Sequence, residues 1–437
     1  MNKKPINNSF VALKNRQEMT QYNTAMLPNG LRIIHRPSAS PVVYCGYAVN
    51  AGTRDELSGE EGMAHFVEHM TFKGTEKRKA LQILNCLERV GGDLNAFTGK
   101  EDTVYHAAIL HEHTARAVDL LTDIVFNSTY PQADIDKEVE VICDEIESYN
   151  DSPSELIYDE TENAVFDHCP LGHSILGEAQ QLRTYTTAHA KAFTQRLYRP
   201  DNAVFFAYGD IAFSRLVAML RRAHGIDAAS KLLPCPAPSA VTERNRRPSG
   251  LAPYTPSSNV KEMSTHQTHV MLANRAYPMG DKRRIALYLM NNILGGPGMN
   301  ARLNLSLRER HALVYTVESF ITSYGDTGLW GLYFGCDPHD TARCLRLVRK
   351  ELDRFMKQPL TDTQLKAAKR QIKGQIGVAC DSRESFALDF AKTFLHYGLE
   401  KDVTSLFSQL DDVTATDIQE VAQDIFKEEC ITRMIIK

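Results

Sequence analysis

Two histidines and a glutamate near the start of the chain have a spacing that can bind and use a metal ion. His65, Glu68 and His69 form an H-x-x-E-H pattern, and at ~100° per residue they fall at about 0°, −60° and +40° around a helix. The two imidazoles are then neighbours that can ligate one zinc ion. The carboxylate shares their face, where it can reach a metal-bound water and act as a general base. The pattern therefore favours a hydrolytic zinc site over a helix that carries two structural histidines.

A third metal ligand is expected from an acidic helix over Pro131–Tyr149. Its isoleucines and valine recur at helical spacing and mark a buried stripe. Glu138 and Glu145 lie on one flank of this stripe, at about −60° and −80° from Ile135, whereas Glu147 points toward solvent. Periodicity leaves Glu138 and Glu145 as alternatives. A helix without any ligand is a further alternative, because acidic helices are usually only solvated.

The composition is typical of a globular chain with more than one domain. The 437 residues are 43% hydrophobic and 24% charged, which excludes disorder, collagen and coiled coil as the main architecture. The length predicts two large domains or about three ordinary ones. The net charge of −4 leaves no basic surplus to neutralise phosphates, so no nucleic-acid partner is expected.

The sequence favours a cytoplasmic protein that has no membrane partner. No stretch approaches the ~18 apolar residues of a membrane span. The N-terminal apolar patch Phe10–Leu13 is shorter than the core of a secretory signal, although a leader removed from the chain is an alternative. The nine cysteines are scattered and form no C-x-x-C pair, which indicates reduced thiols rather than disulfides.

Strand-like and helical segments are mixed without strict alternation, so an α+β fold is predicted. We divide the chain into an arm over residues 1–22, a zinc-bearing domain over 23–225, a Pro/Ser/Arg-rich linker over 226–259 and a second domain over 260–437. In each domain a strand run leads into a long helical pattern. We therefore expect two homologous domains that arose by duplication, each a mostly antiparallel sheet packed with helices.

Several segments resemble the M16, or pitrilysin-type, metallopeptidases, the family that includes insulin-degrading enzyme and the mitochondrial processing peptidase. The H-x-x-E-H pattern lies in GMAHFVEHMTFKGT, which resembles the signature of this inverzincin family. The other matching segments are PNGLRII (28–34), NAGTRDE (50–56), GGDLNAFTGKEDTVY (91–105), EVEVICDE (138–145), LYRPDNAVFFAYGDI (197–211) and ARLNLSLRERHALVYTV (301–317). The combination covers roughly residues 23–430 and is far more specific than the five-residue pattern alone.

The resemblance implies one zinc ion per chain. His65, His69 and Glu145 would be its protein ligands, with a water in the fourth position. Glu68 would activate this water as the general base. Glu138, seven residues before the third ligand, would orient the ligands by hydrogen bonding.

The resemblance also implies residues that contact the substrate. Arg308 and Tyr315 would lie across the substrate from the zinc and donate hydrogen bonds to its carbonyl. Glu101 is a second candidate for orienting the ligands. A strand would bind the substrate backbone by adding it to the sheet, and its residues are Asn95, Ala96, Phe97 and Thr98.

The resulting prediction is a zinc-dependent endopeptidase that hydrolyses peptides or unfolded segments in an enclosed chamber. Full-length members of the family have four such domains, whereas this chain carries two, so the resemblance implies a homodimer with composite sites. The alternatives are a processing-peptidase subunit that needs another partner, a non-catalytic scaffold, and a zinc-binding protein without turnover. The retained base and the count of three protein ligands argue against the last two.

Overall fold

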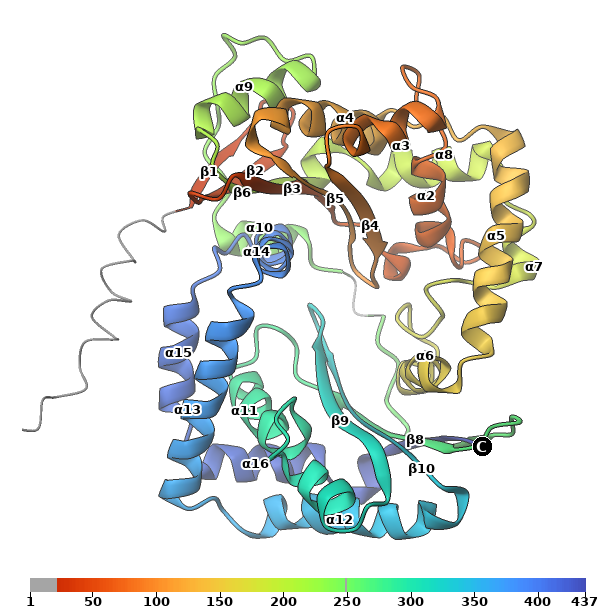
Figure 1. Ribbon diagram of the computed structural model, residues 1–437, viewed down its shortest axis with the longest axis vertical. Coiled ribbons are helices and arrows are strands. Elements are labelled where there is room, and N and C mark those ends of the chain that lie inside the picture. Colours follow the sequence, from red (N-terminus) through yellow and green to blue (C-terminus); the bar gives the residue numbers. More distant parts are fainter. Residues whose placement is uncertain (1–21, 248–249) are drawn as a thin grey trace, which may run out of the picture.

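Two mixed β-sheets, one in each half of the chain, organise the fold (Figure 1). The computed structural model describes residues 22–247 and 250–437. Sheet 1 has six strands in the order β1-β2-β6-β3-β5-β4, and sheet 2 has five in the order β7-β11-β8-β10-β9. The strands of sheet 1 are β1 (Asn23–Met26), β2 (Arg32–Pro37), β3 (Val42–Val49), β4 (Asp93–Thr98), β5 (Thr103–Leu110) and β6 (Ala203–Gly209). Those of sheet 2 are β7 (Ser258–Lys261), β8 (Thr268–Ala276), β9 (Val314–Ser323), β10 (Gly328–Cys336) and β11 (Thr432–Ile436).

The two sheets share one topology. In sheet 1 β2 is parallel to β6, and in sheet 2 β7 is parallel to β11, whereas the other neighbouring pairs of described strands are antiparallel. Apart from β1, each strand of sheet 1 therefore has a counterpart at the same position in sheet 2. The predicted α+β class is confirmed, and the shared topology agrees with the expected duplication.

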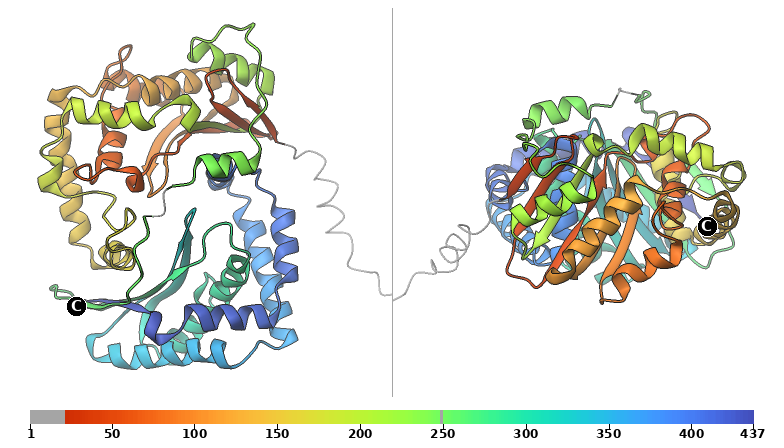
Figure 2. Two further views of the ribbon diagram at one scale, coloured as in Figure 1. Left: turned by 180° about the vertical axis from the view of Figure 1, so that it is seen from behind. Right: turned by 90° about the horizontal axis from the view of Figure 1, so that it is seen from above.

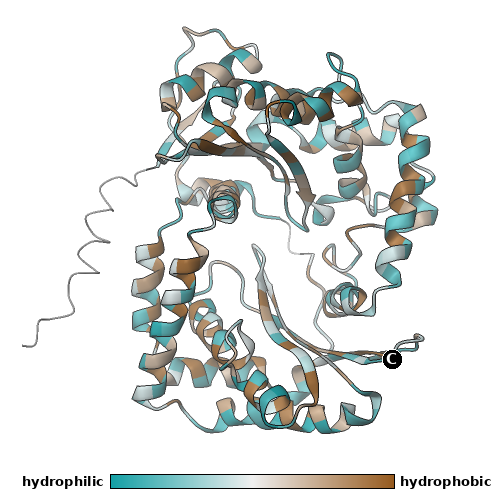
Figure 3. Ribbon diagram, in the orientation of Figure 1, coloured by the Kyte–Doolittle hydropathy of each residue, from teal (hydrophilic) through white to brown (hydrophobic). Residues whose placement is uncertain are grey.

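Helices cover one face of each sheet and bury its apolar side chains. Figure 3 shows apolar residues along the strands of both sheets and along one side of many helices. The helices whose apolar residues join the main core of sheet 1 are α2 (Met63–Thr71), α3 (Ala80–Glu88), α4 (Thr114–Phe126), α5 (Gln132–Asn150), α7 (Ala179–Leu182), α8 (Thr187–Leu197) and α9 (Phe213–Ala223). Those of sheet 2 are α11 (Arg283–Gly295), α12 (Thr341–Lys357), α13 (Asp362–Ala379), α15 (Val403–Asp412) and α16 (Ala415–Ile425). None of the helices in the described ranges combines the length and the apolar character that a membrane crossing needs.

One helix of each half packs on the sheet of the other half (Figures 1 and 2). Helix α6 (Pro153–Val165) follows α5 in the sequence but lies against β8 and β11, where Leu156 and Ile157 contact the buried Met271. Helix α14 (Arg383–Tyr397) returns from the second half to the other face of sheet 1. Its side chains buried on that face include Phe386, Phe390 and Phe394. Each half therefore completes part of the core of the other.

The structure adds helices to the predicted division of the chain. The segment over 178–197 forms two of them, α7 (Ala179–Leu182) and α8, because the Thr186 side chain caps a new helix by accepting a hydrogen bond from the His189 N–H. Helix α10 (Pro238–Arg244) lies within the predicted linker and packs against α14. The predicted arm lies outside the described residues except for Tyr22, and the predicted domain boundaries stay a prediction.

Ion pairs join the two halves at the turn between β4 and β5. The nearly buried Arg54 donates hydrogen bonds to Glu101 Oε1 at 2.7 Å and to the two carboxylate oxygens of Asp326, in the second half, at 2.8 and 2.6 Å. On the same turn, Asp102 Oδ2 lies 2.9 Å from Nε2 of His396, which belongs to α14. These contacts fix the end of β4 relative to the second half.

Candidate metal centre

Helix α2 presents the two histidines, and its first turn is held by groups from other segments. Gly62 precedes the helix with a φ of +88°, and a Cβ at this position would lie 2.7 Å from the Cα of Gly177, so the site requires glycine. The Glu56 carboxylate accepts hydrogen bonds from the backbone N–H groups of Gly62 at 3.0 Å and Ala64 at 2.8 Å. These N–H groups have no partner within the helix. His173 Nε2 lies 2.8 Å from the same carboxylate, so the start of α2 is fixed in place.

The structure brings His65, His69 and Glu145 together. Glu145 Oε1 lies 3.9 Å from His65 Nε2, and Glu145 Oε2 lies 3.5 Å from His69 Nε2. One ligand atom from each of the three residues lies within 4.8 Å of the other two. The i, i+4 spacing places the two imidazole rings 4.6 Å apart between centroids. Two imidazoles and one carboxylate fit zinc, and they leave a fourth position open, as catalytic zinc sites do.

Electrostatics around the imidazoles favour metal binding. Burial, and then the neighbouring His69, lower the pKa of His65 to about 3, so this imidazole is neutral at physiological pH. The neutral ring is the form that ligates a metal. No described residue hydrogen-bonds the buried Nδ1 of His65. The orientation of this ring is therefore set by packing rather than by a hydrogen bond.

Glu138 fixes the second imidazole instead. Its Oε1 lies 3.1 Å from His69 Nδ1, and its Oε2 lies 2.5 Å from Lys73 Nζ. Burial raises the pKa of Glu138, but the hydrogen bonds from His69 and Lys73 outweigh this effect and lower it. The ionised carboxylate therefore accepts a proton-bearing Nδ1 and leaves Nε2 of His69 facing Glu145. A carboxylate in this position sets the tautomer of a metal-binding histidine.

Glu68 lies on the same helix face and bonds to a strand. Thr98 Oγ1 donates a hydrogen bond to Glu68 Oε2 at 2.5 Å. Burial raises the pKa of Glu68, and the hydrogen bond from Thr98 partly offsets that rise. The second carboxylate oxygen remains available for a water or a substrate group beside the three candidate ligands.

Strand β4, which contains the predicted substrate-binding residues 95–98, is an edge strand. Among the described strands only β5 pairs with it. The Ala96 N–H donates to the Asn95 side chain at 2.9 Å rather than to β5, so it faces the open edge. An extended peptide can add to such an edge. Because Thr98 belongs to this strand, the open edge ends beside Glu68.

The contacts of Glu101 do not support its predicted role in orienting the ligands. Its carboxylate accepts hydrogen bonds from Arg54 at 2.7 Å and from the backbone N–H of Gly325 at 3.3 Å. Arg247 Nη1 lies 3.6 Å from the same carboxylate. Glu101 therefore belongs to the ionic cluster between the two halves.

Arg308 and Tyr315 lie together in the second half. The Arg308 guanidinium lies 5.3 Å from the centre of the Tyr315 ring, and Tyr315 is 79% exposed. The β9–β10 hairpin contacts the first half through Gly325, but Tyr315 is near the opposite end of β9. The eight strand steps from Tyr315 to Ser323 span about 26 Å at ~3.3 Å each. The structure thus joins this pair but does not place it beside the candidate ligands of the same chain.

Two residues at the site escaped the sequence analysis. Lys73 follows His69 by four residues in the sequence, just beyond the end of α2 at Thr71, so its short separation from His69 could have suggested that it also approaches Glu138. Glu56 offers no such signal, because it reaches the start of α2 from a separate segment. Thr98 was expected to bind substrate backbone, and its contact with Glu68 was not foreseen.

Two family models match the chain. The model described as "Insulinase (Peptidase family M16)" matches residues 32–179, which include all three candidate ligands, and the model described as "Peptidase M16 inactive domain" matches residues 184–372. The chain is 31% identical to an uncharacterized zinc protease of Streptomyces coelicolor over 91% of this chain and 86% of that protein. It is 29% identical to the uncharacterized zinc protease YmxG of Bacillus subtilis over 93% of this chain and 96% of that protein.

Solved structures share the fold. A protease from Helicobacter pylori superimposes with a TM-score of 0.84 at 20% identity and covers 96% of this chain and 100% of its own. A Pseudomonas fluorescens structure described as a peptidase M16 inactive domain gives a TM-score of 0.82 at 20% identity, with coverage of 95% and 98%. The two-sheet architecture described above is therefore common to all three chains.

Proposed function

Because this chain belongs to peptidase family M16, the insulinase family, we propose that it is a zinc-dependent endopeptidase that hydrolyses peptides and unfolded segments. The observation that carries the proposal is the group formed by His65, His69 and Glu145, whose ligand atoms lie within 4.8 Å of one another beside Glu68. The zinc-protease names of the relatives support the same metal.

Glu68, Thr98 and Glu138 have separate roles in the proposed reaction. When bound, a zinc ion would polarise a peptide carbonyl and lower the pKa of a water molecule. Glu68 takes the proton of the attacking water and later gives it to the leaving amine. Thr98 holds one oxygen of Glu68, and Glu138 holds Nδ1 of His69. The base and one imidazole are therefore oriented before substrate arrives.

The open edge of β4 selects extended substrates. A peptide that adds to this edge pairs its backbone with the Asn95–Thr98 segment and ends its path beside Glu68. A folded domain cannot offer an unpaired strand without local unfolding, so peptides and unfolded segments are favoured.

Arg308 and Tyr315 complete the site from a second copy of the chain. Within one chain they lie near the far end of β9, where Tyr315 is exposed to solvent. In a symmetric pair the zinc-bearing half of one copy faces the second half of the other, and each site uses residues of both chains. The exposure of Tyr315 is compatible with this arrangement, because its side chain is accessible to a second copy of the chain. The alternatives are a processing-type subunit with a different partner and a non-catalytic scaffold.

One experiment separates these alternatives. Purified full-length chain is analysed for metal and incubated with a mixed set of unfolded peptides, with and without a chelator. We expect one zinc per chain and hydrolysis that the chelator stops. Glu68→Gln should keep the zinc and lose hydrolysis, because the change removes the base but no ligand. A chain that binds no zinc, or a Glu68→Gln chain with normal turnover, would refute the proposal.

A further inference from the structure

The outer edge of β7 is open at a position that is covered in the other sheet. In sheet 1, β2 is parallel to β6 on one side and antiparallel to β1 on the other. Its counterpart β7 is parallel to β11, and no strand in the described ranges pairs with its other side. The fold thus builds one sheet with six strands and the other with five, and the vacant position is the one that β1 fills.

The open side of β7 carries unpaired backbone groups. The carbonyl oxygens of Ser257 and Lys261 accept hydrogen bonds from β11, from Arg433 N at 2.8 Å and Lys437 N at 3.1 Å. Successive residues of a strand direct their backbone groups to opposite sides. Val260, between these acceptors, therefore points its N–H and carbonyl away from β11. An edge of this kind is a template for another strand.

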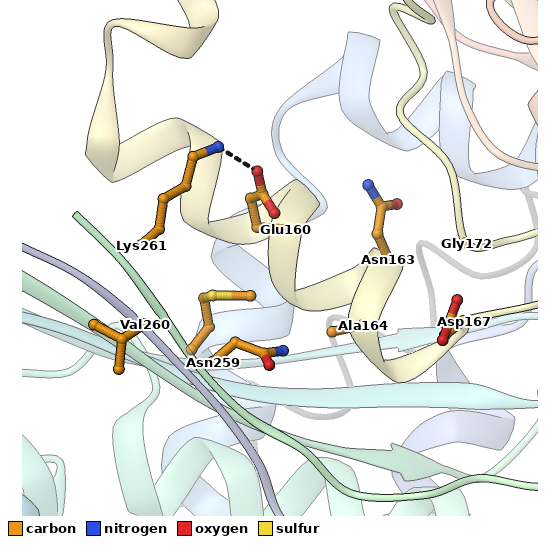
Figure 4. A pocket seen from close by; sticks show the side chains of 9 residues that line it. Glu160, Asn163, Ala164, Asp167, Gly172, Asn259, Val260 and Lys261 are labelled. Carbon is orange, nitrogen blue, oxygen red and sulfur yellow. Dashed lines mark hydrogen bonds and ion pairs between the residues drawn. The ribbon is translucent and has the colours of Figure 1, made fainter. Parts of the chain in front are cut away.

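A pocket of about 370 Å³ lies between this edge and α6. Figure 4 shows Lys261 reaching from β7 to Glu160 on α6, and the two charges lie 2.5 Å apart. Asn163 also lines the pocket, and no described residue hydrogen-bonds its buried Oδ1. The pocket thus lies next to the free backbone groups of the strand and has an unsatisfied polar atom in its wall.

The charges of the pocket favour a cationic guest. Glu160 neutralises Lys261, which leaves Asp167 as the remaining carboxylate of the lining. Asp167 Oδ2 lies 3.3 Å from Nε2 of His168, whose side chain is 86% exposed. The pocket also lies beside the end of α6 at Val165, where the carbonyl end of a helix is negative.

We propose that the outer edge of β7 binds an extended stretch of the polypeptide substrate as an added antiparallel strand, with a lysine or arginine of the guest directed at Asp167. The inference rests on the proposed function, which supplies extended polypeptide. It also rests on position, because α6 directly follows α5, the helix that carries Glu145. A substrate long enough to reach both the β4 edge and the β7 edge is held at two places.

Binding is tested on the full chain carrying Glu68→Gln, in the presence of a chelator, so that nothing is cut and no metal is needed. The probe is a fluorescent ten-residue peptide of alternating lysine and threonine, measured by anisotropy. Val260→Pro removes the outward N–H while leaving the bonds to β11, since proline is tolerated at strand edges. We expect it to weaken binding by about tenfold or more, and the matched Val260→Thr to change it by less than about twofold.

Two further arms keep the result interpretable if Val260→Pro disturbs folding. Asp167→Asn should weaken the lysine peptide by several fold and leave an alternating glutamine–threonine peptide unchanged. Ala96→Pro blocks the β4 edge instead, and part of the binding should survive it. Equal binding by Val260→Pro, Asp167→Asn and the parent chain, or complete loss with Ala96→Pro alone, would overturn the inference. Failure of the proposed function would appear separately, as absent zinc or absent hydrolysis.

Discussion

The Thr98 hydroxyl and the Glu68 carboxylate are joined by a hydrogen bond of 2.5 Å that links an edge strand to the helix of the candidate metal centre. The strand is the one expected to receive substrate, and the carboxylate is the proposed base. A peptide that pairs with β4 therefore docks on the element that already orients Glu68. Substrate position and base position are set by one short segment of backbone.

Removing this hydroxyl should reduce turnover rather than substrate binding. Thr98→Val keeps the shape and strand preference of the side chain but removes the donor to Glu68. A hydrogen bond to a charged group is worth about 1.5–3 kcal/mol, so we expect kcat to fall about 10- to 100-fold with little change in KM. Thr98→Ser, which keeps the hydroxyl, is the control and should restore most of kcat. A change in KM alone would mean that Thr98 contacts substrate instead of Glu68.

The metal ligands can be separated from an acidic neighbour on the same helix. Glu145→Gln, His65→Ala and His69→Ala should each lower zinc occupancy, because each removes a donor atom from the group of three. Glu147→Gln is the matched control, since Glu147 lies outside the group of three and should leave zinc content unchanged. Zinc per chain after dialysis is the measurement. Equal metal loss at positions 145 and 147 would contradict the assignment.

Mixing two inactive chains tests the composite site. Glu68→Gln lacks the base, and Tyr315→Phe lacks the phenol of the second half. If sites form between two copies, a mixed dimer contains one site with both lesions and one with neither, so activity should return to about a quarter of the native value per chain at equal mixing. Recovery is followed after subunit exchange has been shown by sedimentation. Full activity of a monomer would argue against the arrangement.

The contact between Asp102 and α14 should make stability depend on pH. Burial raises the pKa of Asp102, but the hydrogen bond from His396 and the charge of Lys392 outweigh burial and hold the pKa well below its ordinary value of 3.8. A depressed carboxyl pKa contributes stability above the unfolded value, and this contribution is lost as the pH falls through the folded value. The Tm of the native chain should therefore exceed that of Asp102→Asn most above about pH 5, and the gap should shrink below about pH 4. A gap that stays constant from pH 7 to pH 3 would contradict the ion pair.

The candidate ligands could be found from the sequence because helical spacing is local. His65 and His69 are one turn apart, so their proximity follows from the helix alone. The choice between Glu138 and Glu145 did not follow, because two turns separate them on the same flank of α5. The structure places both at the imidazoles, with Glu145 facing the two Nε2 atoms and Glu138 behind His69.

The exchange of helices could not be predicted from the sequence. The apolar residues of α14, such as Phe386 and Phe390, indicate that one face of the helix is buried, but they do not indicate which sheet covers it. The same holds for Leu156 and Ile157 of α6. The surroundings of Glu101 were not predicted for a related reason, since its ion-pair partner Arg54 also binds Asp326, which lies far away in the sequence. Contacts between the halves are set by tertiary packing, which periodicity does not record.

Because α14 is made late, one face of sheet 1 stays uncovered during part of the synthesis of this chain. All strands of sheet 1 exist once residue 209 has been made, but the face covered by α14 waits for residue 397. At about 5–20 residues per second the wait lasts roughly 10 to 40 seconds. Throughout it the nascent first half presents Ile34, Val104 and Phe206 to water, so a ribosome-bound chaperone that shields apolar strands has a defined interval in which to act.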